Sequence, residues 1–178
     1  MTRIAEAWPQ QVYAALQGAG VKLVAYVPDA GHTRLIELCH ADPAQRAVVL
    51  STEEEGIGIA AGAWLGGMRS ALLMQSSGVG NCINALGMVA ECRFPLLMVV
   101  TMRGEAGETN PWQLPMGRAT PAVLAAMGVE VRAAARAEEI APAVAAGARR
   151  AFDQSAAVAV LIAQQVIGVK SFDEPAGK

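Results

Sequence analysis

The sequence predicts a doubly wound α/β domain, with a six-stranded, mainly parallel sheet and helices on both of its faces. Several strand-like runs are continuously apolar, such as the run from Phe94 to Thr101, which is typical of parallel strands covered on both sides. Helix-like segments separate these runs, and right-handed crossovers between parallel strands then give the doubly wound arrangement. The predicted strands cover residues 22–27, 46–50, 70–75, 94–101, 129–132 and 157–163.

The segments between the strands have the marks of helices. The first has amphipathic spacing and ends at Gly18 and Gly20, and the helix after the second strand has an acidic first turn and ends at Gly66-Gly67. A Ser/Gly-rich segment before Gly80 is expected to be a turn, and 103–117 a polar loop. The predicted helices cover residues 6–18, 32–40, 53–65, 80–90, 119–127 and 138–152.

Length and charge indicate one domain and exclude two classes of partner. The chain of 178 residues is long enough for one substantial core, expected at residues 1–168, followed by a flexible C-terminal tail at 169–178. A formal net charge of −2 without a basic stripe argues against a nucleic-acid partner. No apolar run reaches the roughly eighteen residues that span a membrane, and the N-terminus lacks the order of a signal peptide, so a cytoplasmic protein is expected.

The composition also indicates contact with another subunit. Hydrophobic residues make up 53% of the chain and charged residues 17%, which is apolar for a domain of this size. Part of this excess is expected to face a second chain. The three cysteines, Cys39, Cys82 and Cys92, are an odd number without metal-ligand spacing, so we interpret them as reduced thiols and expect no metal ligands among them.

The segment Glu53-Glu54-Glu55-Gly56 is the most informative feature of the chain. Acidic residues suit the positive end of a helix dipole, which alone explains one or two of them. The rest of this helix is small and apolar, so at least one carboxylate is expected to point into a shielded place and to need a partner or a ligand. The pattern Gly56-x-Gly58-x-x-Ala61 matches a dinucleotide motif by spacing, but the glutamates would repel a pyrophosphate.

Gln75 to Asn81 is expected to be a turn that opens a helix. Its backbone amides suit an anion or the polar edge of a ring, but a tight turn with a serine cap explains the same residues equally well.

Polar residues after two other strands are also candidates. Arg103 is placed to bind a carboxylate, phosphonate or sulfonate, although an ion pair with Glu105 or Glu108 is the alternative. The long loop that follows is typical of a functional lid. Asp29 and His32 come just after the first strand, where His32 suits a general acid or an anion contact, or a capping role. A serine nucleophile is poorly supported, because no Gly-x-Ser-x-Gly motif is present.

Four segments together resemble the pyrimidine-binding half of thiamine-diphosphate-dependent 2-oxo-acid decarboxylases. The resemblance is strongest to the alpha subunit of sulfopyruvate decarboxylase and the N-terminal half of phosphonopyruvate decarboxylase, and it extends over roughly residues 5–165. The segments that carry it are Val27-Pro28-Asp29, Glu53-Glu54-Glu55-Gly56 with Ala60-Ala61-Gly62, Met74 to Asn81, and Arg103-Gly104-Glu105 with Gln113, Gly117 and Thr120.

The resemblance implies a cofactor and a role for one glutamate. In this superfamily a glutamate hydrogen-bonds N1′ of the aminopyrimidine, favours its imino tautomer and so helps to deprotonate the thiazolium. The family pattern has an alanine seven and a glycine nine residues after that glutamate, which selects Glu53 through Ala60 and Gly62. Glu54 fits only with a slip of one residue.

The resemblance further implies a split enzyme. In these enzymes the diphosphate and Mg²⁺ are held by a second domain that contains Gly-Asp-Gly, which this chain lacks. We therefore expect the metal ligands in a separate beta subunit and an active site between the chains of a hetero-oligomer. Two departures, Pro28 to His32 without a serine after the aspartate and Trp112 in the loop, leave room for a bulkier or less charged 2-oxo acid.

The prediction is thus the alpha subunit of a carboxy-lyase that converts a 2-oxo acid of the sulfopyruvate or phosphonopyruvate type to an aldehyde and CO₂. A carboligating, acetolactate-synthase-like subunit and a non-catalytic scaffold are the alternatives. The expected catalytic residues are Glu53 and His32; the expected cofactor contacts are Glu53, Ser76, Ser77, Gly78 and Asn81; and the expected substrate contacts are Asp29, His32, Arg103 and Gln113.

Overall fold

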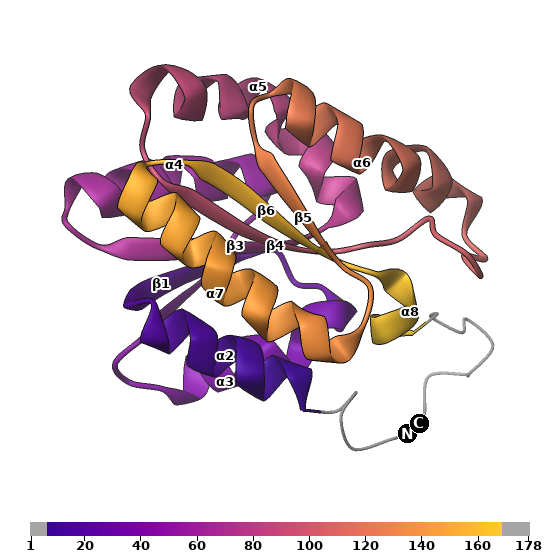
Figure 1. Cartoon of the computed structure of the whole chain (residues 1–178), viewed down its shortest axis with the longest axis horizontal. Coiled ribbons are helices and arrows are strands. Elements are labelled where there is room, and N and C mark those ends of the chain that lie inside the picture. Colours follow the sequence, from indigo (N-terminus) through magenta and orange to yellow (C-terminus); the bar gives the residue numbers. More distant parts are fainter. Residues whose placement is uncertain (1–6, 169–178) are drawn as a thin grey trace.

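The computed structural model describes residues 7–168, which form one open sheet covered by helices (Figure 1). The strand order is β2-β1-β3-β4-β6-β5, and every neighbouring pair is parallel. The predicted six-stranded doubly wound fold is therefore confirmed. The strands are β1 (Val21–Tyr26), β2 (Arg46–Val49), β3 (Arg69–Gln75), β4 (Leu96–Thr101), β5 (Glu130–Ala134) and β6 (Ala157–Ile162).

Helices cover both faces of this sheet. One layer contains α2 (Trp8–Gly18), α3 (Thr33–Ala41) and α7 (Ala137–Gln154), and the other contains α4 (Glu53–Leu65), α5 (Ser76–Cys92) and α6 (Leu114–Ala126) (Figure 1). Two 3₁₀ turns, η1 (Ala30–His32) and η2 (Pro111–Gln113), and a short final helix, α8 (Gln164–Ile167), complete the described chain.

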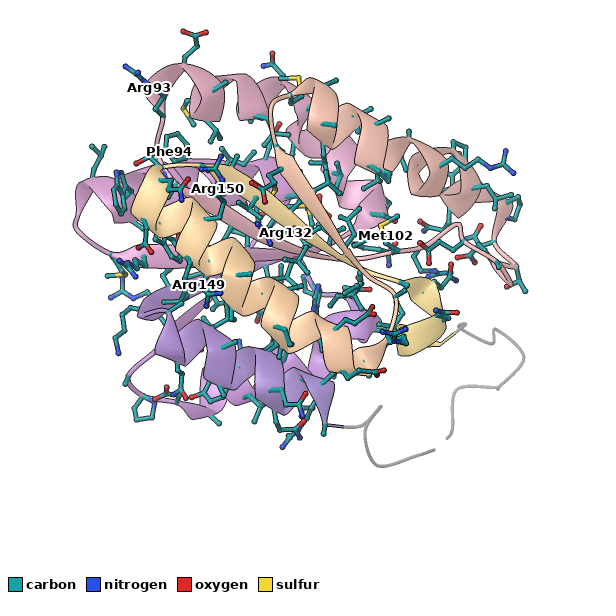
Figure 2. The ribbon with its side chains drawn as sticks, in the orientation of Figure 1. Arg93, Phe94, Met102, Arg132, Arg149 and Arg150 are labelled. Carbon is teal, nitrogen blue, oxygen red and sulfur yellow. The ribbon has the colours of Figure 1, made fainter. Side chains whose placement is uncertain are left out.

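The core has two halves, one on each face of the sheet. Strand β4 is buried along its whole length, and its side chains alternate between the halves. Leu97 and Val99 pack with the α2, α3 and α7 layer, whereas Met98 and Val100 pack with the α4, α5 and α6 layer. Figure 2 shows side chains filling the space between the sheet and its helices. This two-sided burial explains why the strand is continuously apolar in the sequence.

Small residues bring α4 close to the sheet. A Cβ atom on Gly56 would lie 2.4 Å from Cδ1 of Leu72 on β3, so only glycine fits at this contact. Gly58 and Gly62, by contrast, have open space where a Cβ would stand. The close packing of α4 on the sheet thus requires the glycine at position 56 but not those at positions 58 and 62.

Two local predictions were wrong. Helix α5 begins at Ser76, not near Gly80, because Gln75 is extended and leads directly into the helix. The expected serine cap is absent, since the Ser76 hydroxyl instead accepts a hydrogen bond from the Arg103 amide. Helix α6 begins at Leu114, inside the expected loop, and Pro115 is tolerated in its first turn, where an amide donor is not needed.

The parallel arrangement gathers the polar segments at one edge of the sheet. Strand β1 has β2 on one side and β3 on the other, so the winding direction reverses beside it, and ligands of such sheets bind at this point outside the carboxyl ends. Within residues 7–168, no helix has both the length and the hydropathy needed to cross a bilayer. The expected tail, 169–178, lies outside the described residues, and the expected domain boundary at residue 168 stays a prediction.

Candidate active site

The three glutamates at the start of α4 point in different directions. Glu53 is buried, with 8% of its surface exposed, whereas Glu54 and Glu55 are exposed. The Glu55 carboxylate accepts a hydrogen bond from the Ser51 amide at 2.9 Å and so holds the entry to the helix. Only Glu53 therefore matches the expectation of a shielded carboxylate.

Glu53 reaches across to helix α5. Its Oε2 accepts a hydrogen bond from Nδ2 of Asn81 at 2.8 Å. A Cβ atom at Gly78 would lie 2.1 Å from Oε1 of Glu53, so a glycine is required for the carboxylate to lie against this helix. No cation pairs with Glu53 among residues 7–168. The carboxylate is thus shielded, held by one amide, and left with acceptor capacity.

The thiol of Cys82, the residue that follows Asn81 on α5, has its pKa raised to about 12. Burial is the largest cause, and the negative charges of Glu53 and then Glu54 add to it. The thiol is consequently protonated at neutral pH and does not serve as a nucleophile. All three cysteines are free thiols, as the sequence indicated.

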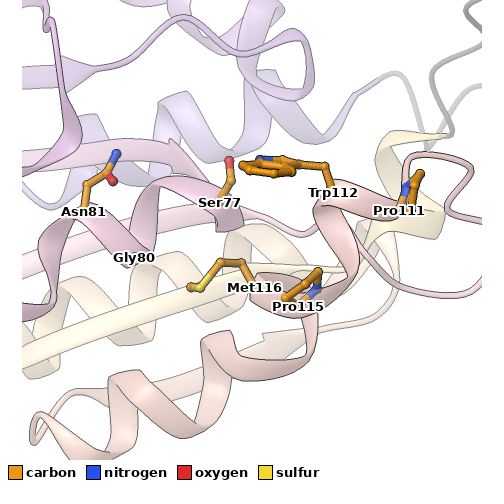
Figure 3. A pocket seen from close by; sticks show the side chains of 7 residues that line it. All are labelled: Ser77, Gly80, Asn81, Pro111, Trp112, Pro115 and Met116. Atoms are coloured by element: carbon orange, nitrogen blue, oxygen red, sulfur yellow. The ribbon is translucent and has the colours of Figure 1, made fainter.

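A groove of about 690 Å³ is bordered by Asn81, the hydrogen-bond partner of Glu53 (Asn81 in Figure 3). One wall is the polar start of α5, and the other is the largely apolar segment from η2 into α6. Trp112 projects from this second wall and is 83% exposed. The predicted loop thus forms one side of the groove, which is lined by Ser77, Gly80, Asn81, Pro111, Trp112, Pro115 and Met116.

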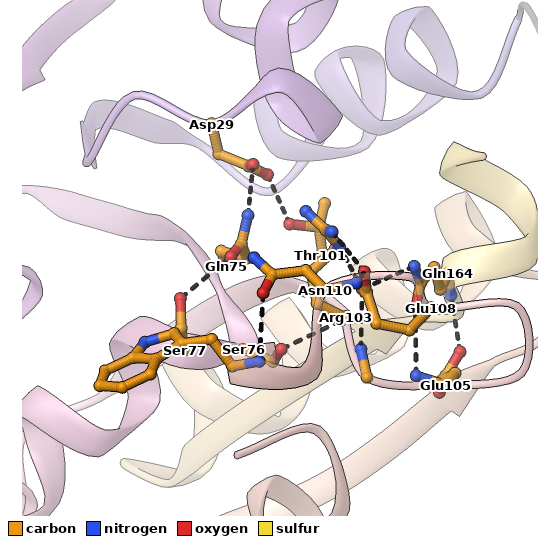
Figure 4. A network of polar contacts seen from close by, with 12 residues as sticks. Asp29, Gln75, Ser76, Ser77, Thr101, Arg103, Glu105, Glu108, Asn110 and Gln164 are labelled. Atoms are coloured by element: carbon orange, nitrogen blue, oxygen red, sulfur yellow. Dashed lines mark hydrogen bonds and ion pairs between the residues drawn. The ribbon is translucent and has the colours of Figure 1, made fainter. Parts of the chain in front are cut away.

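Asp29 lies at the carboxyl edge between β1 and β3 and accepts two hydrogen bonds (Figure 4). Its Oδ1 accepts from Nε2 of Gln75 at 2.9 Å, and its Oδ2 accepts from Oγ1 of Thr101 at 2.6 Å. The Ser77 hydroxyl, which lines the groove, donates in turn to Oε1 of Gln75 at 3.0 Å. Asp29 was predicted from the sequence, whereas its partners Gln75 and Thr101 were missed, although both end strands at the same edge.

The structure does not support the role expected of His32. The side chain is fully buried, and its Nε2 lies 3.1 Å from the carbonyl oxygen of Val99 in the middle of β4. Burial lowers the pKa of this imidazole, because the charged form loses its solvation. The ring is thus turned into the sheet and is not part of the groove lining.

Arg103 likewise has a partner of its own. Its Nε and Nη2 donate to the two carboxylate oxygens of Glu108 at 2.6 and 2.7 Å, and both side chains are shielded from solvent (Figure 4). The hydrogen bonds from Arg103 are the largest cause that lowers the pKa of Glu108, and those to Glu108 raise the pKa of Arg103. The alternative weighed from the sequence, a surface pair of Arg103 with Glu105 or Glu108, is right about Glu108 as the partner, but the pair is shielded and not at the surface.

The Arg103–Glu108 pair is the centre of a hydrogen-bonded cluster that fixes the loop after β4. We call this cluster, formed by Arg103, Glu105, Glu108 and Gln164, the latch. Glu108 also accepts hydrogen bonds from the amides of Gly104 and Asn110 and from Nε2 of Gln164. The amides of Glu105 and Gln164 each donate to the other's side chain, at 3.0 and 2.7 Å. Gln164 was missed from the sequence, but its place directly after β6 is the signal that could have found it.

The remaining residues that the sequence singled out do not line the groove. Ser76 is fully buried and accepts from the Arg103 amide, so its side chain fixes the loop and does not face the groove. Gln113 is not part of the groove lining, and its Oε1 is buried without a partner among residues 7–168. A Cβ at Gly117 would lie 2.1 Å from the Arg103 carbonyl oxygen, so α6 packs directly on the start of the loop. Of the expected cofactor contacts, Ser77 and Asn81 line the groove and Gly78 lies under Glu53.

Comparison with known proteins identifies close relatives. The chain is 40% identical over 124 residues to sulfopyruvate decarboxylase subunit alpha of Methanothermobacter thermautotrophicus, which covers 69% of this chain and 75% of that protein. The corresponding subunit of Methanococcus maripaludis is also 40% identical, over 65% of this chain and 70% of its own length. Phosphonopyruvate decarboxylase of Streptomyces viridochromogenes is 41% identical over 60% of this chain, but the match spans only 28% of that protein. No protein-family model matches the chain.

Solved structures with the same fold are larger enzymes. A 2-oxoglutarate:ferredoxin oxidoreductase from Magnetococcus marinus superposes with a TM-score of 0.70 at 15% identity, over 90% of this chain and 29% of that one. A benzoylformate decarboxylase from Polynucleobacter necessarius gives a TM-score of 0.66 at 17% identity, over 95% and 32%. At these identities the two structures show the fold alone.

The sequence identity to the two alpha subunits extends over most of their length, and the fold recurs in the two solved enzymes. The chain therefore belongs to the family of sulfopyruvate decarboxylase alpha subunits, which are subunits of thiamine-diphosphate-dependent carboxy-lyases.

Proposed function

We propose that this chain is the pyrimidine-binding subunit of an enzyme that decarboxylates a 2-oxo acid of the sulfopyruvate or phosphonopyruvate type to an aldehyde. The observation that carries the proposal is Glu53, a shielded carboxylate with no paired cation among residues 7–168, next to a groove. The names of the relatives supply the reaction and the class of substrate.

The residues around Glu53 fit an aminopyrimidine ring. The Glu53 carboxylate would accept a proton or a hydrogen bond from the ring nitrogen, and its shielded position strengthens such a bond. Gly78 leaves the space that this carboxylate needs, Asn81 fixes its rotation, and Ser77 borders the groove. When bound, thiamine diphosphate supplies the electron sink for the loss of CO₂.

Asp29 is the substrate contact that we retain from the sequence prediction. It is half-buried at the carboxyl edge of β1 and is joined to the groove through Gln75 and Ser77. The proposal gives no substrate contact to His32 or Arg103, because the first is turned into the sheet and the second is paired with Glu108.

We further propose that a beta subunit completes the site with the ligands of the diphosphate and Mg²⁺. The relatives are named as alpha subunits, which implies a partner chain. Large apolar side chains at the surface are available for such contact, since the core of an interface between subunits is richer in apolar area than the rest of the surface. These exposed side chains are Val49, Leu65, Met88 and Trp112.

The test is co-expression with a candidate partner that carries Gly-Asp-Gly. The purified complex, supplied with thiamine diphosphate and Mg²⁺, is expected to release CO₂ and an aldehyde from sulfopyruvate or phosphonopyruvate. Product analysis separates this reaction from carboligation, which would yield a coupled hydroxyketone. Robust decarboxylation by this chain alone would contradict the need for a partner.

A matched pair of variants tests the role of Glu53. Glu53→Gln removes the proton acceptor and should lower kcat of the complex by about 100-fold or more. Glu54→Gln is the control, and it should stay within about threefold of wild type because Glu54 is exposed. Near-wild-type activity of Glu53→Gln, or a loss confined to Glu54→Gln, would move the role to the neighbouring acid.

A further inference from the structure

The carboxyl ends of three strands meet at one side chain, Asp29. The residue follows β1, while its two donors, Gln75 and Thr101, are the last residues of β3 and β4 (Figure 4). The 2.9 Å and 2.6 Å hydrogen bonds engage one carboxylate oxygen each. Asp29 is therefore fixed at the position where the winding of the sheet reverses, which is the binding position of doubly wound folds.

Each donor is itself oriented by its surroundings. An ionised carboxylate only accepts hydrogen bonds, so Gln75 must present its NH₂ group to Asp29 and its oxygen to the Ser77 hydroxyl. Thr101 is fully buried and has a single hydroxyl proton to donate. Its Oγ1 lies 2.6 Å from Oδ2 of Asp29 but 3.4 Å from the carbonyl oxygen of Met74. The shorter contact to a charged acceptor is the stronger bond.

The backbone around Asp29 is built for the same geometry. A Cβ at Gly31 would lie 2.8 Å from Cγ2 of Thr101 and 2.9 Å from Oδ2 of Asp29, so a side chain there would push the pair apart. The Asp29 carbonyl accepts from the His32 amide at 3.0 Å, and His32 is anchored by its ring against Val99. The buried histidine thus holds the turn that carries Asp29.

The held carboxylate still has room to act. A carboxylate offers about four acceptor positions, and the two donors occupy two of them. Asp29 is half-buried and borders a hollow of about 390 Å³ together with Tyr26, Pro28 and Ala30. At the other end of the hydrogen-bonded series, Ser77 borders the groove beside Glu53.

We propose that Gln75 and Thr101 are positioning residues for the decarboxylation: they hold Asp29 as a second functional carboxylate, whose remaining acceptor positions are free for a hydrogen-bond donor at the reacting centre. The inference rests on the proposed function, and it adds two residues that act through Asp29 without touching the substrate. The Asp29 side chain is reachable from solvent, whereas Thr101 is not.

The test is a double-mutant cycle in the complex with the partner subunit. Thr101→Val keeps the shape of the side chain and removes the hydroxyl, and it should lower kcat by about 10- to 100-fold with KM changed by less than about threefold. Thr101→Ser, which restores the hydroxyl, should recover most of kcat. Combined with Asp29→Ala, Thr101→Val should lower kcat by less than about twofold further, because the group through which it acts is gone.

A second variant and two controls separate positioning from general damage. Gln75→Met should lower kcat in the same way as Thr101→Val. Gln45→Met alters another buried glutamine, which bonds the Val21 carbonyl at the opposite end of the sheet, and Ser70→Ala removes a buried hydroxyl at the start of β3. Both controls should keep kcat within about twofold of wild type.

A parallel cycle of thermal unfolding midpoints supplies a readout that needs no turnover. Thr101→Val should lower the midpoint of wild type more than that of Asp29→Ala, since only the first loses the hydrogen bond. Equal shifts in both backgrounds would overturn the inference, even if the complex proved inactive. In an active complex, kcat within twofold of wild type for both Thr101→Val and Gln75→Met, or additive effects of Thr101→Val and Asp29→Ala, would overturn it as well. Absence of any decarboxylation by wild type would instead overturn the proposed function.

Discussion

Two shielded glutamates at the same edge of the sheet differ in how completely the fold satisfies them. Glu108 receives two bonds from Arg103 and three more from Gly104, Asn110 and Gln164. Glu53 receives a single side-chain bond, from Asn81. A carboxylate whose acceptor positions are all filled belongs to the structure, whereas one with positions left over is available to a ligand. The comparison explains why the arginine stabilises the loop, and why Glu53 is the residue to test for catalysis.

Crowding the space around Glu53 should lower the activity of the complex more than any other change that tests the difference between the two glutamates. Gly78→Ala places a methyl group on the carboxylate, so either Glu53 or helix α5 must move, and kcat of the complex should fall by about 100-fold. The matched control is Gly58→Ala on the open side of α4, which should leave kcat unchanged and raise stability by about 0.5–1 kcal/mol. Steady-state kinetics and thermal unfolding check both variants, and full activity of Gly78→Ala would contradict this position of Glu53.

Removing the charge of Glu108 should give the next largest effect, on stability and not on chemistry. Glu108→Gln leaves Arg103 shielded beside a neutral amide, and the free energy of unfolding should fall by about 2 kcal/mol. This loss is smaller than the roughly 3–5 kcal/mol expected when a deeply buried ion pair is broken, because the latch is part of a surface loop. Urea unfolding measures the loss, and Glu37→Gln, which removes an exposed pair with Arg34, is the control, expected to cost less than about 0.5 kcal/mol.

The smallest of these effects is a dependence of stability on pH. The pKa of Glu108 in the fold lies well below its usual 4.5, so its contribution is fully present above about pH 4.5 and is lost as the pH falls toward the folded value. Unfolding at pH 6 and pH 3.5 should therefore show a smaller loss of stability on acidification for Glu108→Gln than for wild type. Equal losses in the two proteins would mean that the Arg103–Glu108 pair is not formed in solution.

The fold and a shielded acid at the start of α4 were predictable, because the apolar runs and the composition of that helix can be read directly from the sequence. Continuous apolar runs predict a covered parallel sheet, and such a sheet brings Asp29, Glu53 and the start of α5 to one edge. The apolar remainder of α4 predicted that one of its acids is shielded. The choice of Glu53 among the three acids came from the pattern of the family that the sequence resembles, through Ala60 and Gly62, and it agrees with the burial of Glu53.

His32 and Arg103 were harder, because the direction of a side chain after a strand depends on contacts far away in sequence. His32 turns inward to bond Val99, which is 67 positions away, and the loop that holds Arg103 is closed by Gln164, which is 56 positions from Glu108. The start of α5 was misplaced for a similar reason. Serines and glycines favour turns locally, but the buried hydrogen bond from the Arg103 amide to Ser76 stabilises a helix there.

The latch also decides which part of the chain is open to redesign. Arg103, Glu105 and Glu108 tie the first six residues after Met102 to two separate elements, α5 and α8, so an insertion there would break several of the hydrogen bonds that hold the loop. Beyond Asn110, whose side chain still caps the next turn by accepting from the Trp112 amide, the side chains of Pro111 and Trp112 are exposed and line the groove. Directed evolution toward new substrates should thus vary Pro111 and Trp112 and leave residues 103–108 unchanged.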